Sequence, residues 1–183
     1  MERKAELRRE TRESDILVKM DLDGSGKISV KCDDQFLRHM VETMGRYADL
    51  DLIVEASGDN DHHLIEDVAI VMGKAFRECL GDAPIERIAS ALIPMDDALV
   101  EVAVDIVDRP YAELDCPDTL YAHFFRSFAM SSGITLHIVV LRGYDGHHIV
   151  EASFKALGRA LRAAVRLRQS ELSTKGKPKV KSR

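Results

Sequence analysis

DHHLIEDVAIVMGKAFRECL (residues 61–80) returns near the other end of the chain as GHHIVEASFKALGRALRAAV (residues 146–165). Two adjacent histidines, a glutamate three residues after the second of them and a later glycine recur at a constant offset of 85 residues. Upstream, FLRHMVETM (36–44) resembles the stretch that contains YAHFFRSFA (121–129), with His39 matched to His123 at an offset of 84, which implies one insertion or deletion between the copies. A duplicated half-domain is the simplest explanation of this repeat.

Hydrophobic periodicity predicts helices and strands in the same order in both halves. Helical spacing of apolar residues occurs in four segments, at 35–47, 64–80, 119–130 and 149–167. Alternating stretches predict strands at 51–56, 87–94, 98–107 and 135–141, and two short strands joined by a glycine turn between Asp15 and Lys31. The predicted fold is therefore α+β and internally duplicated, with a first half-repeat and N-terminal arm at 1–94, a second half-repeat at 95–169 and a basic tail at 170–183.

Composition excludes several classes of protein. The chain has 183 residues, 45% hydrophobic and 31% charged, which suits one compact domain. Its net charge of −5 argues against nucleic-acid binding, and it has no run of about 18 apolar residues that could span a membrane. The charged start MERKAELRRETRES lacks the apolar segment of a secretory signal, so we expect a cytoplasmic protein whose Cys32, Cys79 and Cys116 are reduced.

The repeated histidines and glutamates have the spacing of a metal site. Residues three and four apart share one face of a helix, so each glutamate faces both histidines that precede it. Adjacent histidines diverge by about 100° around a helix, which favours two different ions for the two neighbours. A lone histidine on a helix is more often a surface or core residue than a ligand, but a set that recurs in register is hard to attribute to chance. Both halves together offer six imidazoles and two carboxylates: His39, His62, His63, Glu66, His123, His147, His148 and Glu151.

The kind of donor indicates a catalytic transition-metal site. Imidazole with carboxylate favours Mn, Fe or Zn over Mg or Ca, and the absence of cysteine from the set argues against a structural zinc site. Eight ligands for two ions leave positions open for a substrate, which favours catalysis.

An ordered set of short motifs resembles imidazoleglycerol-phosphate dehydratase, an enzyme family of histidine biosynthesis. DHHLIED and HHIVEASFKA resemble the family's paired DHHxxED and HHxxEAxFKA motifs, and further similar elements are FLRHM, AHFF, DRPY, SGITLHI and STKG. The resemblance runs from about Arg9 to Gly176. One such match would be weak, whereas the ordered set is highly specific.

The resemblance implies an active site in which the eight residues above hold two Mn²⁺ ions. It implies that Glu13, in RRETRES, or Glu151 carries a proton, so that the predicted catalytic set is Glu13, Glu151, His62 and His147. It also implies that the substrate, chiefly its phosphate, contacts Arg87, Arg109, Lys155, Ser173 and Lys175. On composition alone, the five Lys and Arg among the last nine residues suggest either a solvated tail or an arm over an anionic ligand. The resemblance favours a phosphate pocket for the STKG part.

The resemblance also implies a reaction, a fold and an assembly. The reaction is the manganese-dependent dehydration of imidazole glycerol phosphate to imidazole-acetol phosphate. The fold is a helical layer sandwiched between two four-stranded sheets, of the ribosomal protein S5 domain 2-like kind. The assembly is a homo-oligomer of 24 subunits with sites at subunit interfaces and with no nucleic-acid or membrane partner.

Four features depart from the family pattern. Arg38 stands where the family has an aspartate before the first ligand histidine, Thr43 replaces a glutamine, Tyr47 replaces a later histidine, and the loop GDNDHH (58–63) is three residues shorter than usual. An aspartate at position 38 would orient the imidazole beside it. These departures leave open an alternative, a di-metal-binding relative with altered substrate or reduced turnover. A helical di-metal storage or oxidase protein fits less well because the chain contains several strands, and a purely structural oligomer would not need eight ligands in register.

Overall fold

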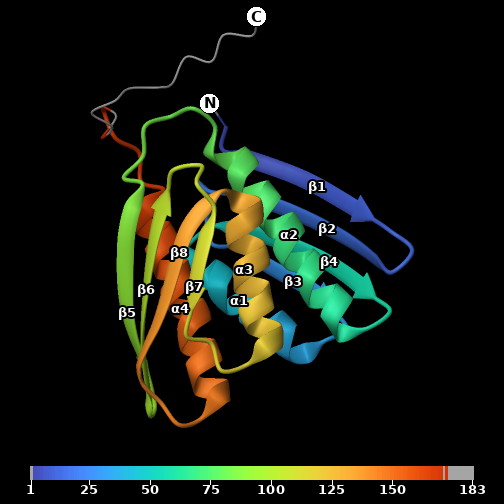
Figure 1. Ribbon diagram of the computed structural model, residues 1–183. Coiled ribbons are helices and arrows are strands. Elements are labelled where there is room, and N and C mark those ends of the chain that lie inside the picture. The colour runs from blue at the N-terminus through green and yellow to red at the C-terminus, as the bar shows by residue number, and fades with distance from the viewer. Residues whose placement is uncertain (1, 171, 173–183) are drawn as a thin grey trace, which may run out of the picture.

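The structure is a computed structural model that describes residues 2–170 and 172. Its two halves have the same order of elements: three strands, a helix, a strand and a helix (Figure 1). The first half consists of β1 (Lys4–Glu10), β2 (Ser14–Asp21), β3 (Ile28–Cys32), α1 (Gln35–Ala48), β4 (Asp51–Gly58) and α2 (Asp61–Leu80). The second consists of β5 (Ile88–Met95), β6 (Ala98–Ile106), β7 (Tyr111–Leu114), α3 (Thr119–Ser132), β8 (Ile134–Arg142) and α4 (Gly146–Ala164).

Each half forms one four-stranded sheet. The strand orders are β1-β2-β4-β3 and β5-β6-β8-β7, and in both sheets only the last strand runs parallel to its neighbour. The two strands predicted between Asp15 and Lys31 are β2 and β3, but they do not pair with each other, because β4 lies between them. The predicted pairing was wrong because β4 arrives from beyond α1, and a local turn signal cannot show such an insertion.

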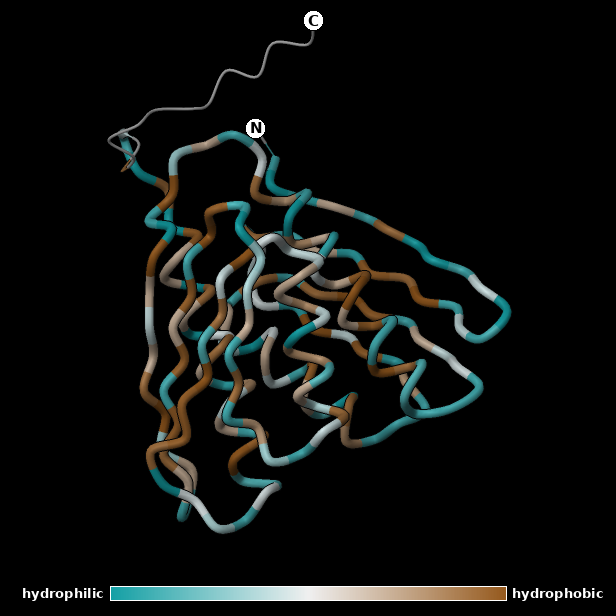
Figure 2. Tube along the Cα trace, in the orientation of Figure 1, coloured by the Kyte–Doolittle hydropathy of each residue, from teal (hydrophilic) through white to brown (hydrophobic). Residues whose placement is uncertain are grey.

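The four helices lie between the two sheets (Figure 1), which confirms the predicted α+β sandwich. α1 and α2 cover the first sheet, whereas α3 and α4 cover the second. Across the layer α2 packs on α3 and α1 packs on α4, so each of these helix pairs joins the two halves. Figure 2 shows hydrophobic stretches along the strands and helices and hydrophilic stretches in the loops. Phe124, Phe125 and Phe154 are fully buried in the layer, with ring centroids 4.6–5.8 Å apart.

The two sheets are divided between α2 and β5. β5 pairs with β6 along its whole length, so the predicted boundary at 94/95 falls inside the second sheet, next to the β5–β6 turn. Nearly all of the predicted tail at 170–183 lies outside the described residues. Among the helices that the structure describes, none is long and apolar enough to cross a membrane.

Two strands have no counterpart among the predicted elements. β1 pairs with β2 over its full length, but its sequence KAELRRE is charged on the exposed face and offers mainly Ala5 and Leu7 to the core. β7 has four residues and pairs in parallel with β8. Hydrophobic periodicity needs a longer or more apolar stretch than either strand provides.

Both long helices begin three residues before their predicted starts. The side chain of Asn60 accepts a hydrogen bond from the His63 amide at the start of α2, and that of Asp145 accepts one from the His147 amide at the start of α4. Such N-caps stabilise a polar first turn that carries no apolar periodicity. Each histidine pair therefore lies within the first turn of a helix. α4 ends at Ala164, three residues before its predicted end.

One glycine in each long helix allows a close approach to the helix of the other half. A Cβ added at Gly73 would lie 2.7 Å from the carbonyl oxygen of Phe128 in α3. A Cβ at Gly158 would lie 2.5 Å from the carbonyl oxygen of Met44 in α1. The glycines that the repeat aligns thus set the spacing of the two helix pairs.

Candidate metal centre and active site

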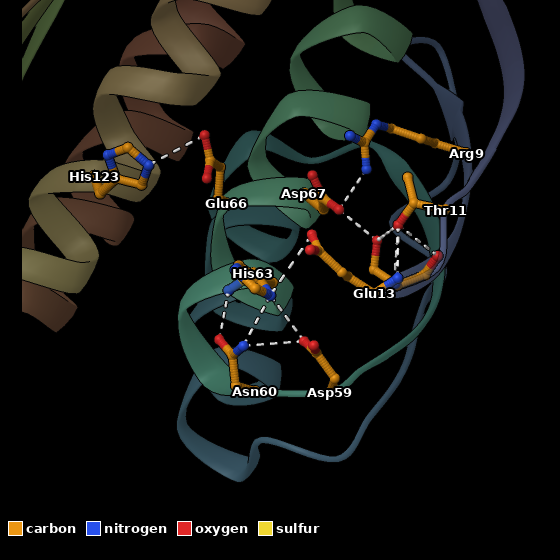
Figure 3. Close-up of polar contacts among 10 residues, drawn as sticks. Arg9, Thr11, Glu13, Asp59, Asn60, His63, Glu66, Asp67 and His123 are labelled. Atoms are coloured by element: carbon orange, nitrogen blue, oxygen red, sulfur yellow. Dashed lines mark hydrogen bonds and ion pairs between the residues drawn. The ribbon is translucent and has the colours of Figure 1, made fainter.

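α2 and α3 bring together three of the predicted ligands, His62, Glu66 and His123, which we call the first trio. The His123 Nε2 lies 3.2 Å from the Glu66 Oε1, and the rings of His62 and His123 stack with centroids 5.1 Å apart. One donor atom from each residue can be chosen so that all three lie within 4.8 Å of one another. Figure 3 shows Glu66 reaching from α2 towards His123 on α3. The first trio therefore draws on both halves of the chain.

α1 and α4 bring together a second trio, His39, His147 and Glu151. The Nε2 atoms of His39 and His147 lie 3.5 and 3.6 Å from the same oxygen of Glu151. The sequence repeat relates this trio to the first, position by position. In both trios the histidine–glutamate pair comes from one half and the single histidine from the other, because α2 packs on α3 and α1 packs on α4.

His63 turns away from the first trio towards the β1–β2 loop (Figure 3). Its Nδ1 lies 2.8 Å from the Asp59 Oδ1 and 3.7 Å from the Glu13 Oε2. The hydrogen bond to Asp59, helped by the charge of Glu13, raises the pKa of His63 above its ordinary value. Glu13 also accepts the Asp59 amide through its carbonyl, at 2.9 Å. The predicted proton carrier Glu13 thus lies beside a predicted ligand.

His148 turns away from the second trio towards the β5–β6 turn. Its Nδ1 lies 2.6 Å from the Asp97 Oδ1, and its Nε2 lies 3.5 Å from the Asp96 Oδ2. The hydrogen bond to Asp97 raises the pKa of His148, and the same bond holds the pKa of Asp97 well below its ordinary value. Within each pair of adjacent histidines the ring planes differ by 75° and 85°. The two histidines of a pair also contact different groups, since His147 faces Glu151 and His148 faces Asp97.

The chemistry of the donors fits a metal ion. Among the described residues, the His123 Nε2 is a buried atom without a hydrogen-bond partner, and its approach to Glu66 is an ion-pair contact only. A buried polar atom left unpaired costs about 1–3 kcal/mol, a cost that a cation bound between imidazole and carboxylate would remove. Such a mixed donor set suits Mn, Fe or Zn. His62, Glu66 and His123 could therefore hold a transition-metal ion.

Glu151 is a buried carboxylate with three cationic or imidazole neighbours. Its side chain accepts the Lys155 ammonium at 2.9 Å, in addition to facing His39 and His147. Burial alone would raise the pKa of Glu151, but Lys155, His39 and His147 together bring it below its ordinary value. Glu151 is therefore ionised near neutral pH, as a metal ligand must be.

Comparison with known proteins agrees with this geometry. The profile of the imidazoleglycerol-phosphate dehydratase family matches residues 33–161. The chain belongs to this family. An imidazoleglycerol-phosphate dehydratase from Methanothermobacter thermautotrophicus is 47% identical to it, over 92% of this chain and 94% of the relative. One from Desulfitobacterium hafniense is 44% identical, over 95% and 97%.

Solved structures of the family have the same fold. The Pyrococcus furiosus dehydratase superposes with a TM-score of 0.83 at 40% identity, over 93% of this chain and 99% of the other. The Staphylococcus aureus dehydratase superposes with a TM-score of 0.80 at 32% identity, over 90% and 99%. The chain is accordingly an enzyme, a hydro-lyase of histidine biosynthesis.

Two arginines that the resemblance assigns to phosphate binding lie far from the second trio of the same chain. Arg87 pairs with Asp105, with its Nε 2.7 Å from the carboxylate, and its amide binds the carbonyl of Ala164 at the end of α4. Ala164 lies 13 residues after Glu151 along α4, which is about 20 Å at the rise of a helix. Arg109 lies beside the start of β8, because its carbonyl accepts a hydrogen bond from the Thr135 hydroxyl at 2.9 Å, whereas α4 begins after the other end of β8.

Of the other three predicted substrate contacts, only Lys155 lies within the described residues. Lys155 lies beside the second trio, bonded to Glu151, with its ammonium 5.9 Å from the ring centre of Tyr47. Ser173 and Lys175 lie outside the described residues.

The four departures leave both trios intact. Arg38 is exposed and lines a surface hollow of about 540 Å³ with residues of β2, β3 and β4, so it faces the first sheet. Thr43 is buried in α1, and Tyr47 lies next to the Lys155 ammonium. In the shortened loop, the carboxylate of Asp59 still contacts the His63 ring. None of the altered positions replaces a residue of either trio.

Sequence reasoning missed the carboxylates that support the histidines. Asp59 precedes His63 by only four residues, so the helix start could have suggested it. Asp97 is 51 residues from His148 in the chain, and only the tertiary structure pairs them. Asp67 was seen as part of the family motif but not as a buried residue, 7% exposed, that accepts hydrogen bonds from Arg9 and the Ser14 hydroxyl (Figure 3).

The Arg9–Asp67 pair attaches the loop that carries Glu13 to α2, and this attachment can be tested. Arg9→Gln is expected to lower the free energy of unfolding by about 1 kcal/mol, because it weakens the pairing of a buried carboxylate while the arginine itself is about a third exposed. Urea midpoints at fixed protein concentration measure the effect. Arg8→Gln is the matched control, since Arg8 pairs with Asp15 on the solvent side of the same strand and its replacement should leave the free energy of unfolding unchanged. Equal effects of the two substitutions would contradict the role given to Asp67.

Proposed function

We propose that this family member converts imidazole glycerol phosphate to imidazole-acetol phosphate at a site that holds two Mn²⁺ ions. The observation that carries the proposal is the pair of matched trios, each built from both halves, with a further histidine beside each. The eight proposed ligands are His39, His62, His63, Glu66, His123, His147, His148 and Glu151. When bound, the ions would stabilise the negative charge that develops on the imidazole ring as water leaves.

The contacts of the two candidate glutamates favour Glu13 as the proton carrier. The Glu151 carboxylate is buried and engaged by Lys155 and by two histidines, so it is suited to bind a metal rather than to move a proton. The Glu13 side chain is 58% exposed and lies 3.7 Å from His63, at the border between solvent and the metal centre. A carboxylate in that position can accept a proton from one atom of a bound substrate and donate it to another.

The positions of the arginines support an active site shared between copies of the chain. Imidazole glycerol phosphate has three carbons between its ring and its phosphate, far too few to span about 20 Å. If the ring binds at the second trio, Arg87 of the same chain lies too far away to hold the phosphate, which favours an arginine from a neighbouring copy, and Arg109 likewise lies at the end of β8 away from the start of α4. We therefore propose a homo-oligomer of 24 subunits whose sites lie at subunit interfaces, with Lys155, Ser173 and Lys175 as further contacts.

Mixing two inactive variants tests the shared site. A metal-site variant (His62→Ala with His147→Ala) and an arginine variant (Arg87→Gln with Arg109→Gln) are each expected to be inactive. The two variants are co-expressed in equal amounts with different tags and purified together. They should recover about a quarter of wild-type activity, because each site takes its histidines from one copy and its arginines from another, and each of these is intact in about half of the copies. Recovery is measured as imidazole-acetol phosphate formed.

The same variants, purified separately and mixed without reassembly, are the control and should stay inactive. Failure of the co-expressed mixture to recover activity, with both tags present in one particle, would place all the groups in a single chain and contradict the proposal.

Turnover of imidazole glycerol phosphate by the purified, manganese-loaded chain tests the function itself. Formation of imidazole-acetol phosphate is the expected result. Full metal loading without turnover would instead favour a di-metal-binding relative with altered substrate, and other imidazole phosphates would then be assayed. The cytoplasmic location stays a prediction.

A further inference from the structure

In both halves the second histidine of the pair turns its Nδ1 towards a carboxylate. The distances are 2.8 Å from His63 to Asp59 and 2.6 Å from His148 to Asp97. The Asp97 carboxylate is itself held in place, because its Oδ2 accepts the amides of Tyr144 and Asp145 at 2.5 and 3.1 Å. His148 and Asp97 are also both more than two-thirds shielded from solvent.

The two carboxylates reach their histidines from unrelated positions in the chain. By the offset of the repeat, the position that matches Asp59 in the second half is Tyr144, which has no carboxylate and is almost fully exposed. The second half takes its carboxylate from the β5–β6 turn instead. A histidine–carboxylate contact therefore occurs in both halves, but the carboxylates come from different elements. The contact in the second half was not inherited through the duplication, which indicates that it has a function at the histidine.

We propose that Asp97 is a positioning residue that keeps the hydrogen of His148 on Nδ1 and so leaves Nε2 free to bind a metal ion. The Nδ1 of His63 lies 2.8 Å both from Asp59 and from the amide nitrogen of Asn60, which can only donate, so the assignment is made for His148 alone. A carboxylate on the far nitrogen of a ligand histidine selects the tautomer, sets the ring orientation and increases the basicity of the metal-binding nitrogen. The inference rests on the proposed function in one respect, that His148 is a metal ligand.

Titration of the metal-free, full-length chain with Mn²⁺ alone tests the role of Asp97 without any assay of activity. Asp97→Asn is expected to weaken one class of Mn²⁺ sites by about 10- to 100-fold. An asparagine amide can donate to Nδ1, which would move the histidine hydrogen to Nε2 and block that nitrogen. Asp97→Glu keeps the carboxylate and is expected to restore part of the affinity.

Asp51→Asn is the matched control. Asp51 also fixes a loop by accepting two backbone amides, those of Ser25 and Lys27, each at 2.8 Å. It lies on β4, and its hydrogen bonds go to this loop rather than to a histidine. Its substitution should leave Mn²⁺ affinity unchanged, which separates the loss of a loop contact from the loss of histidine positioning.

A double-mutant cycle with His148→Ala decides the outcome. Asp97→Asn should have no further effect on Mn²⁺ affinity in the His148→Ala background, because the residue acts only through His148. An equal effect in both backgrounds would show a merely structural role and overturn the inference, as would unchanged affinity in Asp97→Asn while His148→Ala weakens binding. Unchanged affinity in His148→Ala itself would remove His148 from the ligand set of the proposed function, and the role of Asp97 with it.

Discussion

Replacing His62 and His147 together by alanine is expected to lower the rate of imidazole-acetol phosphate formation by about 10³-fold or more. Each substitution removes one imidazole from a trio, and a bound metal contributes several kcal/mol of charge stabilisation in reactions of this kind. At about 1.4 kcal/mol for each factor of ten, 4 kcal/mol corresponds to roughly 10³-fold. The rate and the number of Mn²⁺ ions retained per chain after gel filtration should fall together.

His137→Ala is the matched control for this loss. His137 is the one histidine of the seven in the chain that lies outside the proposed ligand set. It is exposed on β8, with its ring centroid 5.6 Å from that of Tyr111. Its substitution should leave rate and metal content unchanged. A double variant that kept full activity with its metal lost would show that the trios are not the reaction centre.

Gly158→Ala is expected to destabilise the protein by about 1–3 kcal/mol, although alanine is the better helix former by about 1 kcal/mol. The added methyl group would meet the Met44 carbonyl oxygen at 2.5 Å, the Tyr47 Cβ at 2.9 Å and the Ala48 amide nitrogen at 3.0 Å. Two of these are backbone atoms of α1, which cannot move aside as a flexible side chain could, so α4 and α1 must separate. Thermal or urea unfolding at fixed protein concentration measures the change.

Gly146→Ala provides the comparison within the same helix. A Cβ at Gly146 would have its nearest neighbour 3.9 Å away, at the Pro117 ring, so this variant should be as stable as the wild type or slightly more stable. Wild-type stability in Gly158→Ala would mean that the close approach of α1 and α4 does not depend on this glycine. Because His39 and Glu151 lie on these two helices, we also expect Gly158→Ala to weaken Mn²⁺ binding.

The helices and the candidate ligands could be read from the sequence because their signals are local. A histidine and a glutamate four residues apart lie on one helix face whatever the rest of the chain does. The repeat then aligned Gly73 with Gly158 and His39 with His123 without any knowledge of the fold. The true starts of α2 and α4 were missed because Asn60 and Asp145 form polar first turns outside the apolar pattern.

The strand pairing and the grouping of the ligands depend on contacts between distant segments. The sequence alone identified β2 and β3 as strands, but only the tertiary structure inserted β4 between them. Likewise, Glu66 meets His123, and Glu151 meets His39, because each long helix packs on a helix of the other half. A backbone pairing partner or a helix-packing partner tens of residues away has no local signature.

By itself, then, the sequence determined the duplication, the helices and the residue types of the candidate metal centre, since all of these follow from short, periodic motifs. Only the tertiary structure decided that both trios combine the two halves, that Asp97 contacts His148, and that Arg87 and Arg109 lie far from the second trio of their own chain. The physical reason is the same in each case: side-chain positions across the helical layer follow from the packing of whole elements, in which a glycine such as Gly158 sets the distance.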